Sequence, residues 1–109
     1  SGVYNTGPGA TWVDLSSNDF YDVNTSAVIA TDGLIYVGLV VTNDHATQDL
    51  FVVWGAGAAR ATTFAIKLAA GEVFEEPNMR GIANGIDVTT VAIQGSGAAT
   101  SCRIYARFA

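Results

Sequence analysis

The sequence has few charged side chains, and basic ones are especially scarce. Only 14% of the 109 residues are charged, against roughly 25% in an average soluble domain. Lys and Arg together number five, so the formal net charge is −5. Binding to nucleic acid needs a cluster of bases that displaces counterions from the phosphates. Because the sequence contains no such cluster, we predict no nucleic-acid partner.

Cysteine is nearly absent, since Cys102 is the only one. A lone cysteine can form neither a disulfide within the chain nor a Cys-based metal site. Cys102 lies in the alternating run SCRIYARF, on the side that carries Ile104, Ala106 and Phe108. Free cysteine is among the most often buried residue types. We therefore predict that Cys102 packs in the core, whereas the alternative, a disulfide between chains, requires an exposed thiol.

Histidine also occurs once, as His45 in the loop sequence NDHATQD. A zinc site needs further nitrogen or sulfur ligands, and a hydrolytic site needs a nucleophile with its base. We interpret His45 as a solvated loop residue, with a contact residue or a site shared between chains as alternatives. Nearby, Asn43, Asp44 and Asp49 carry oxygen atoms that suit Ca²⁺, but their spacing matches no EF-hand loop.

The acidic residues supply no recognisable catalytic pair. Glu75 and Glu76 are adjacent in the sequence, so in a strand they point to opposite faces and cannot flank one glycosidic bond. We interpret them as solvated edge charges that deter the addition of a further strand. Together with the single His and Cys, this predicts a protein that is not an enzyme and uses no cofactor.

Long apolar runs are missing as well. No stretch approaches the roughly 18 consecutive apolar residues of a membrane span. The chain does not open with a basic segment followed by an apolar one, which is the pattern of a secretory leader. We therefore predict no membrane partner.

Strand-length apolar runs, separated by turn signals, fill most of the chain. The turn signals include Thr31-Asp32-Gly33 and the stretch GSGAAT, and no helical period longer than a turn is present. Such regular spacing is typical of an all-β sandwich or small barrel. About eight strands are expected, from candidate segments at residues 12–15, 20–23, 27–30, 34–42, 49–54, 62–68, 72–76, 86–94 and 101–108.

Residues 34–76 read as a meander of neighbouring strands. The segment at 34–42 is too apolar to alternate cleanly, which predicts a central strand covered on both sides. Gly38 in its middle indicates a bulge or a close approach, with Trp54 as the ring that fits against it. Residues 43–49 then form a loop between antiparallel partners, and GSGAAT forms a hairpin loop. In residues 86–94 a second bulge is expected at Thr89-Thr90, where the apolar parity changes.

The domain organisation follows from length and composition. A chain of 109 residues has room for one domain and one core. Residues 1–10 carry three Gly and one Pro without any period, which predicts an extended N-terminal arm outside the core. Residues 11–109 are then a single antiparallel β-sandwich, either jelly-roll-like or immunoglobulin-like.

Two segments carry a resemblance to a known group of proteins. The run VVTNDHATQDLFVVWGAGAARATTFAIKLAAGEVFEEP, followed by GIDVTTVAIQGSGAATSCRIYARF, resembles small β-sandwich virion proteins of tailed bacteriophages. The resemblance covers residues 34–108 and consists of turn patterns. It implies a capsid decoration (cement), head fibre or tail accessory subunit, located in the virion, that binds the major capsid protein or other virion proteins. It also implies a homo-oligomer, with a trimer favoured, and no catalytic residues.

For such a protein the arm and the loops are the expected contact regions. The alternative is a carbohydrate-binding or cell-surface adhesion module, which predicts exposed Trp12 or Trp54 beside polar loops. The candidate partner-binding residues are anchoring rings in the arm and polar residues in the loop after residue 43, namely Tyr4, Pro8, Trp12, Asp44, His45 and Gln48.

Overall fold

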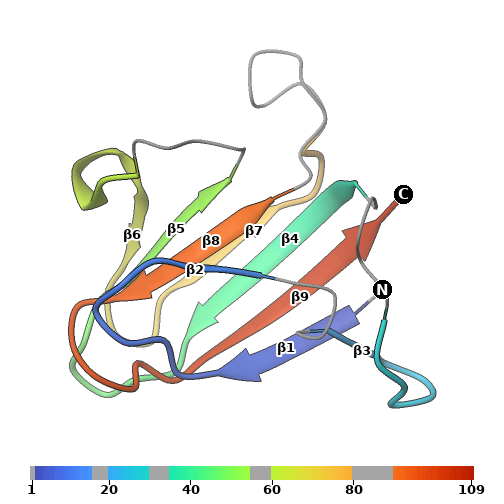
Figure 1. The fold of residues 1–109 in the computed structure, drawn as a ribbon, viewed down its shortest axis with the longest axis horizontal. Coiled ribbons are helices and arrows are strands. Elements are labelled where there is room, and N and C mark those ends of the chain that lie inside the picture. Colours follow the sequence, from blue (N-terminus) through green and yellow to red (C-terminus); the bar gives the residue numbers. More distant parts are fainter. Residues whose placement is uncertain (1, 16–19, 30–34, 55–59, 80–89) are drawn as a thin grey trace.

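The computed structural model of the chain describes residues 2–15, 20–29, 35–54, 60–79 and 90–109 (Figure 1). Its one helical element in those residues is a three-residue 3-10 turn, η1 (Thr62–Phe64). This confirms the all-β prediction. The strands are β1 (Gly2–Thr6), β2 (Val13–Asp14), β3 (Tyr21–Asp22), β4 (Tyr36–Asn43), β5 (Leu50–Trp54), β6 (Ile66–Leu68), β7 (Val73–Glu76), β8 (Val91–Gly95) and β9 (Cys102–Phe108).

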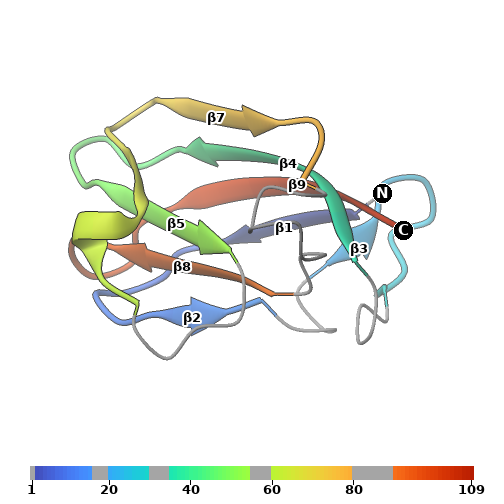
Figure 2. The same cartoon turned by 90° about the horizontal axis from the view of Figure 1, so that it is seen from above.

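The strands form two antiparallel sheets that lie face to face, as Figure 2 shows. One sheet is five-stranded, in the order β3-β1-β9-β4-β7, and the other is four-stranded, in the order β2-β8-β5-β6. The strands β4, β5, β8 and β9 bury residues on the side that faces the opposite sheet. The predicted antiparallel β-sandwich is confirmed.

The strands pair in a nested order. β1 pairs with β9 and β2 with β8, while β4 pairs with β7 and β5 with β6. The connections β1–β2, β4–β5, β6–β7 and β8–β9 each cross from one sheet to the other. Because the strands that they join are paired, β1–β2 is the neighbour of β8–β9, and β4–β5 is the neighbour of β6–β7. Two Greek keys wound in this way make a jelly roll, with β3 as an additional edge strand beside β1.

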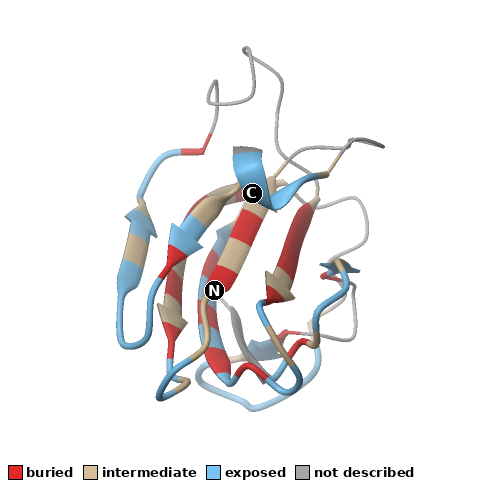
Figure 3. Ribbon diagram, turned by 90° about the vertical axis from the view of Figure 1, so that its left-hand side faces the viewer, coloured by how far each residue is buried: buried red, intermediate tan, exposed pale blue. Residues whose placement is uncertain are grey.

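The core lies between the sheets and follows the pleat of the long strands. In β9, Cys102, Ile104 and Ala106 are fully buried, and the residues between them are exposed. Figure 3 shows such alternation of buried and exposed bands along the strands. The prediction that Cys102 is a core residue is confirmed. Three aromatic rings pack edge to face or tilted against one another in the same core: Phe20, Tyr36 and Phe108.

The meander predicted for residues 34–76 is wrong, because this segment supplies both sheets. β4 and β7 lie in the five-stranded sheet, and β5 and β6 lie in the four-stranded one. β8 and β9 are likewise in different sheets, so GSGAAT is an arch between sheets and not a hairpin loop. A polar loop of this length has the same composition in both arrangements. Which one forms depends on the faces that the flanking strands bury.

The N-terminal segment also differs from the predicted arm. Residues 2–6 form β1, which lies inside the five-stranded sheet between β3 and β9. The Gly and Pro residues that suggested an arm, Gly7, Pro8 and Gly9, belong to the crossing that follows β1. This segment is hydrogen bonded to the β8–β9 arch, because Gly9 and Pro8 accept from the amides of Gly95 and Thr100, each at 2.9 Å.

Three local predictions have different outcomes. The strand predicted at residues 62–68 exists only from Ile66, because β6 has the single partner β5 and their pairing ends at Val52 and Ile66. The bulge near Gly38 is confirmed, since the β4–β9 register shifts between Tyr36 and Gly38. The fit of Gly38 against Trp54 is wrong, and Trp54 stacks on Phe74 with ring centroids 5.4 Å apart. The second bulge, expected at Thr89-Thr90, falls partly outside the described residues.

Candidate functional site

Four crossings between the sheets gather at one end of the sandwich, opposite the two termini (Figure 1). We call this region the corner end: residues 7–12, 44–49, 69–72 and 96–101. Asn43, which is fully buried, connects the second and third of these segments. Its side-chain amide donates to the carbonyls of Gln48 at 2.8 Å and Leu68 at 3.0 Å, and its oxygen accepts from the amide of His45 at 3.0 Å.

His45 stabilises the same loop through its ring. Nδ1 accepts from the amides of Thr47 at 3.1 Å and Gln48 at 2.9 Å. Because Nδ1 accepts twice, it carries no proton in this arrangement, and the ring proton lies on Nε2. The predicted contact residue His45 thus has an internal role, as a cap for the turn that follows it.

Pro8 and Gln48, which are far apart in the sequence, meet at Thr100. The buried Thr100 hydroxyl donates to Oε1 of Gln48 at 2.5 Å, and its amide donates to the Pro8 carbonyl at 2.9 Å. Gln48 also lies against Gly97, whose Cα could not carry a methyl group without meeting Nε2 of Gln48 at 2.9 Å. The corner end is therefore one hydrogen-bonded network that joins residues from both sheets.

Asp44 forms an ion pair at the edge of this network. Its carboxylate receives both Nε and Nη2 of Arg103, at 2.7 and 3.0 Å. The hydrogen bond and the charge of Asp44 raise the pKa of Arg103. Asp44, like His45 and Gln48, has a partner within its own chain.

The two predicted aromatic anchors lie at either end of the β1–β2 crossing. Tyr4 is in β1, opposite Ile104 of β9, and Trp12 is half-buried just before β2 in the other sheet. Five of the six candidate residues thus lie in the corner-end segments, and Tyr4 lies outside them in β1.

A different surface is open, on the outer side of the five-stranded sheet. We call it the outer face; its residues are Gly38, Val40 and Thr42 of β4, Val73 and Glu75 of β7, and Arg103, Tyr105 and Arg107 of β9. Val73 is 52% exposed and Tyr105 39% exposed. Sequence alternation does predict the outward direction of Arg103, Tyr105 and Arg107, which the structure confirms.

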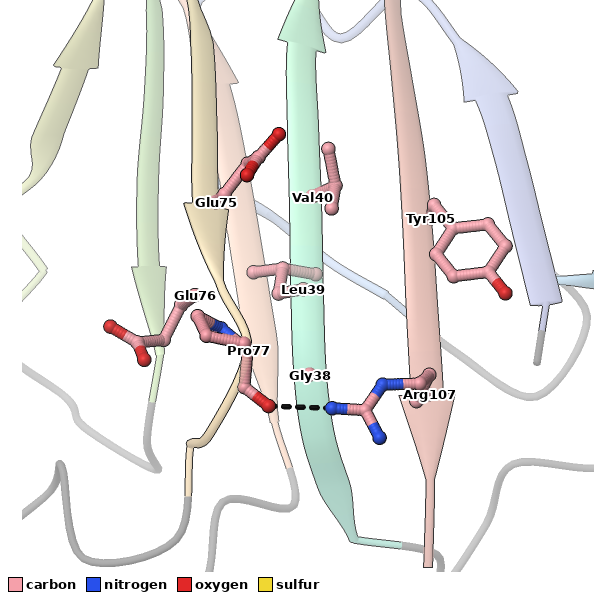
Figure 4. A pocket seen from close by; sticks show the side chains of 8 residues that line it. All are labelled: Gly38, Leu39, Val40, Glu75, Glu76, Pro77, Tyr105 and Arg107. Atoms are coloured by element: carbon pink, nitrogen blue, oxygen red, sulfur yellow. Dashed lines mark hydrogen bonds between the residues drawn. The ribbon is translucent and has the colours of Figure 1, made fainter.

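A shallow groove of about 140 Å³ crosses this face along β4 (Figure 4). Val40 stands in the middle of a row, with Glu75 beside it on β7 and Tyr105 beside it on β9. Gly38 lies in the next row, opposite Arg107. The remaining lining comes from Leu39, Glu76 and Pro77.

Arg107 reaches across the groove because Gly38 has no side chain. Its guanidinium passes over Gly38 and donates to the Pro77 carbonyl at 2.5 Å (Figure 4). A Cβ on Gly38 would meet Nη2 of Arg107 at 2.7 Å. The close approach predicted at Gly38 is therefore made by Arg107.

The groove carries opposite charges that do not pair with each other. Within the described residues, the ion pairs join Arg60 to Asp14, Lys67 to Asp49 and Arg103 to Asp44, and neither Glu75 nor Arg107 takes part in one. Glu75 points toward Val40 in Figure 4. The groove thus has on one side a carboxylate without an ion-pair partner in the described residues, an apolar floor, and on the other side a guanidinium with spare donors.

The tryptophans do not form the exposed platform that a sugar-binding module requires. Trp12 and Trp54 are both half-buried, and Trp54 stacks on Phe74 at an interplanar angle of 22°. Carbohydrate binding therefore stays a prediction, without an exposed tryptophan in the described residues to support it.

The described residues contain no group of three or more His, Cys, Asp and Glu side chains placed to hold a metal ion. Of the residues considered for Ca²⁺, Asn43 and Asp44 bind within the chain, as described above, and Asp49 pairs with Lys67 at 3.7 Å. None of the helices in the described part of the chain has the length and apolar character to span a membrane.

Comparison with protein-family models, with curated proteins and with solved structures finds no match to this chain.

Proposed function

We propose that this protein is a structural subunit without catalytic activity, which acts by binding other proteins of a virion as a capsid decoration or accessory subunit. The observation that carries the proposal is the composition of the outer face. It presents Tyr105, Arg107 and Val73 to solvent around a small-residue floor. Tyrosine and arginine are enriched at protein interfaces and among the residues that dominate binding energy.

The shape of the groove also favours a protein partner. Its volume of about 140 Å³ is below the roughly 300 to 1,000 Å³ of a typical small-molecule pocket. A shallow, mixed polar and apolar surface over β9, β4 and the edge strand β7 matches an interface better than a substrate cleft.

The low charge of the chain supports the same proposal. With 14% charged residues, most of the surface consists of groups that lose little hydration when covered by a neighbour. The jelly-roll topology occurs in capsid domains and also in lectins, so the fold agrees with the proposal without choosing the function.

The proposal is tested by quantitative mass spectrometry of purified particles of the phage whose genome encodes the chain. We expect the protein in the particles, in a constant copy ratio to the major capsid protein across density-gradient fractions. A protein of similar abundance from the same lysate, with no structural role, serves as the control for carry-over. Recovery of the chain only among free lysate proteins would overturn the proposal.

A further inference from the structure

We propose that two copies of this chain pair through their outer faces about a two-fold axis that runs along the strands, between β1 and β9. Tyr21 of each copy then lies in the groove of the other. This inference rests on the proposed function to the extent that the chain acts by protein contact, and it names a second copy as one partner of the outer face. It depends on an exposed apolar row that crosses the five-stranded sheet.

The apolar row consists of Val28, Tyr21, Tyr105 and Val40, which lie at one level along the strands. Tyr21 and Tyr105 both pair with Val3 of β1, one from each side. Tyr105 also pairs with Val40, and a bridge joins Tyr21 to Val28. Because residues directly opposite each other in paired strands point to the same side of a sheet, the row points outward with Tyr105. Val28 is 54% exposed and Tyr21 46%, so the exposed apolar part of the outer face continues to the edge strand β3.

The hairpin that carries this end of the row is anchored in the sandwich. Phe20, next to Tyr21, is fully buried and packs edge to face against the rings of Tyr36 and Phe108. The Asp22 carboxylate caps the turn that follows by accepting two backbone amides. A surface that is already ordered loses little conformational entropy when it binds.

A two-fold axis along the strands between β1 and β9 brings the row of one copy onto the row of the other. The rotation keeps each residue at its level along the strands, and it places β3 of each copy over β4 of the other. Tyr21 lies at the level of Val40, since both are joined in register through Tyr105 and β1. Tyr21 therefore lies over Val40 of the other copy, in the groove that Val40 lines. The ring of Tyr105 leans from β9 toward β1 in Figure 4, so the two Tyr105 rings meet at the axis.

The polar groups of the groove complement the hairpin that enters it. Glu75 lies beside Val40 and takes part in no ion pair among the described residues. Its carboxylate can therefore accept a hydrogen bond from the Tyr21 hydroxyl of the other copy. The Arg107 guanidinium, which lies over β4, faces the turn after Tyr21, where Asp22 carries a negative charge.

Arg107 decides where the axis can lie. Its guanidinium lies over β4 and donates to the Pro77 carbonyl, so an axis along β4 would bring two guanidinium groups together, and like charges oppose association. With the axis between β1 and β9, the β4 strands of the two copies are three strand spacings apart, about 14 Å, and the guanidinium groups stay separate. An axis across the strands at the level of Val40 would place Glu75 over Glu75 and is disfavoured for the same reason.

The outer face is large enough for a stable dimer. The molecule measures 34 by 33 Å across its broad side, which Figure 1 shows, and 21 Å along its shortest axis. A standard interface covers about 800 Å² of each partner, which is less than the area of this side. Neither β1 nor β4 carries a charged residue, and Arg103, which lies over β1 of the other copy, keeps Asp44 as its own partner. The contact therefore requires little desolvation of charge.

Sedimentation equilibrium of the full chain over a concentration series up to about 1 mM tests for pairing, since that range detects even weak self-association. We expect a monomer–dimer equilibrium. A chain that stays monomeric over the whole series would overturn the inference, and so would a trimer without a dimer.

A charge introduced at Tyr21 locates the interface. We expect Tyr21→Glu to raise the dissociation constant at least about tenfold, because it places a carboxylate against Glu75 of the other copy at both contacts. An equimolar mixture with Glu75→Lys replaces one of these repulsive contacts by an attractive one and restores the other to its original pair. We therefore expect a mixed dimer that is tighter than the dimer of Tyr21→Glu alone.

Thr62→Glu is the matched control, because it makes the same change in net charge at an exposed residue of η1. It should self-associate as the parent does. Equal weakening by Thr62→Glu and Tyr21→Glu would overturn the proposed interface, and so would a mixture with Glu75→Lys that pairs no better than Tyr21→Glu alone. Urea unfolding checks that each variant is folded.

Cross-linking distinguishes the position of the axis. Cys102 is fully buried, so a cysteine introduced on the outer face is the reactive one in the folded chain. We expect a short bis-maleimide to join Tyr21→Cys to Val40→Cys in a mixture at a concentration where the parent is dimeric, because packed sheets lie about 10 Å apart. Neither variant should cross-link to itself. Cross-linking of Val40→Cys to itself, without the mixed product, would show a different axis and overturn the arrangement.

Failure of this inference can be distinguished from failure of the proposed function. A chain present in particles at a constant copy ratio but monomeric in solution refutes the two-fold pairing and leaves the structural role standing. A chain that pairs through Tyr21 and the groove but is absent from particles has the reverse meaning.

Discussion

At the scale of single residues, Gly9 at the corner end and Gly95 at the end of β8 differ in the space around them. A Cβ on Gly95 would overlap Oγ1 of Thr100 and would lie 2.9 Å from the Pro8 carbonyl oxygen. Gly9, on the crossing segment that binds Gly95, has no atom within 4 Å of the same position. The need for glycine at residue 95 therefore comes from close packing of two crossings.

We expect Gly95→Ala to lower the free energy of unfolding by about 2 kcal/mol, because overpacking forces Thr100 or the Pro8 backbone to move. Urea unfolding followed by circular dichroism measures the change. The matched variant Gly9→Ala should change stability by less than about 0.5 kcal/mol. Equal effects of the two substitutions would show that the crowding at residue 95 is relieved without cost.

Asp22 shows a residue-scale effect that depends on pH. Its carboxylate accepts the amides of Asn24 at 2.8 Å and Thr25 at 3.0 Å, and these hydrogen bonds lower its pKa below the ordinary value of 3.8. Since the folded pKa is the lower one, the stabilisation is complete above the unfolded pKa and is lost as the pH falls through the folded pKa.

The Asp22→Asn variant tests this. Its amide oxygen still accepts hydrogen bonds but does not titrate, so stability should fall less steeply between weakly and strongly acidic solution than in the parent. Urea midpoints at a series of pH values provide the measurement. If the urea midpoints of parent and variant fell equally with pH, the stabilising role assigned to the Asp22 carboxylate would be contradicted.

At the scale of elements, hydrogen bonds at the corner end hold the segments that cross from one sheet to the other. Asn43 terminates β4 and connects the loop before β5 with the end of β6 through two donated hydrogen bonds. Its backbone continues the connection, because its amide donates to the Glu72 carbonyl and its carbonyl accepts from the amide of Gly71. One buried amide thus holds the β4–β5 and β6–β7 crossings side by side.

We expect Asn43→Asp to lower the free energy of unfolding by about 3 kcal/mol, because a buried carboxylate would face two carbonyl oxygens and donate to neither. Thermal unfolding at neutral pH checks the loss. Partial recovery in acid, where the introduced carboxyl group is protonated and regains one donor, would support the hydrogen-bond explanation over a simple packing defect. An unchanged stability would show that the two acceptors are satisfied in another way.

At the scale of the whole molecule, the nested pairing makes the two sheets depend on each other. The β1–β2 and β8–β9 crossings connect the paired strands β1 and β9 of one sheet to the paired strands β2 and β8 of the other. The β4–β5 and β6–β7 crossings connect β4 and β7 to β5 and β6 in the same way. The corner end ties both pairs of crossings together through Thr100 and Gln48. We therefore expect the sandwich to unfold as one cooperative unit.

Two natural probes report on the two sheets. Cys102, the only cysteine, is fully buried on β9 of the five-stranded sheet, and Trp54 lies on β5 of the four-stranded sheet. We expect the thiol of Cys102 to become reactive over the same urea range in which tryptophan fluorescence changes. Reactivity at lower urea than the fluorescence change would show that the sheets unfold separately.

The strands that were predicted well are those with a local signal. Alternation in residues 101–108 identifies β9 together with its buried and exposed sides, and residues 34–42 identify β4 within two residues of its start and one of its end. The hydrogen-bond partners of the predicted contact residues have no such local signal. His45 and Gln48 have the composition of a solvated loop, but their hydrogen-bond partners lie within their own loop or, for Gln48, some 50 residues away at Thr100.

By itself the sequence determines that the chain is all-β, that buried and exposed residues alternate along its strands, and that Cys102 is part of the core. Strand periodicity and the tendency of a side chain to be buried are local properties of the sequence. Only the tertiary structure decides that polar loops are crossings between sheets and that β1 joins the five-stranded sheet. It also brings Glu75, Val40 and Tyr105 into one row. These features depend on the register between strands that are distant in the chain, which no local pattern records.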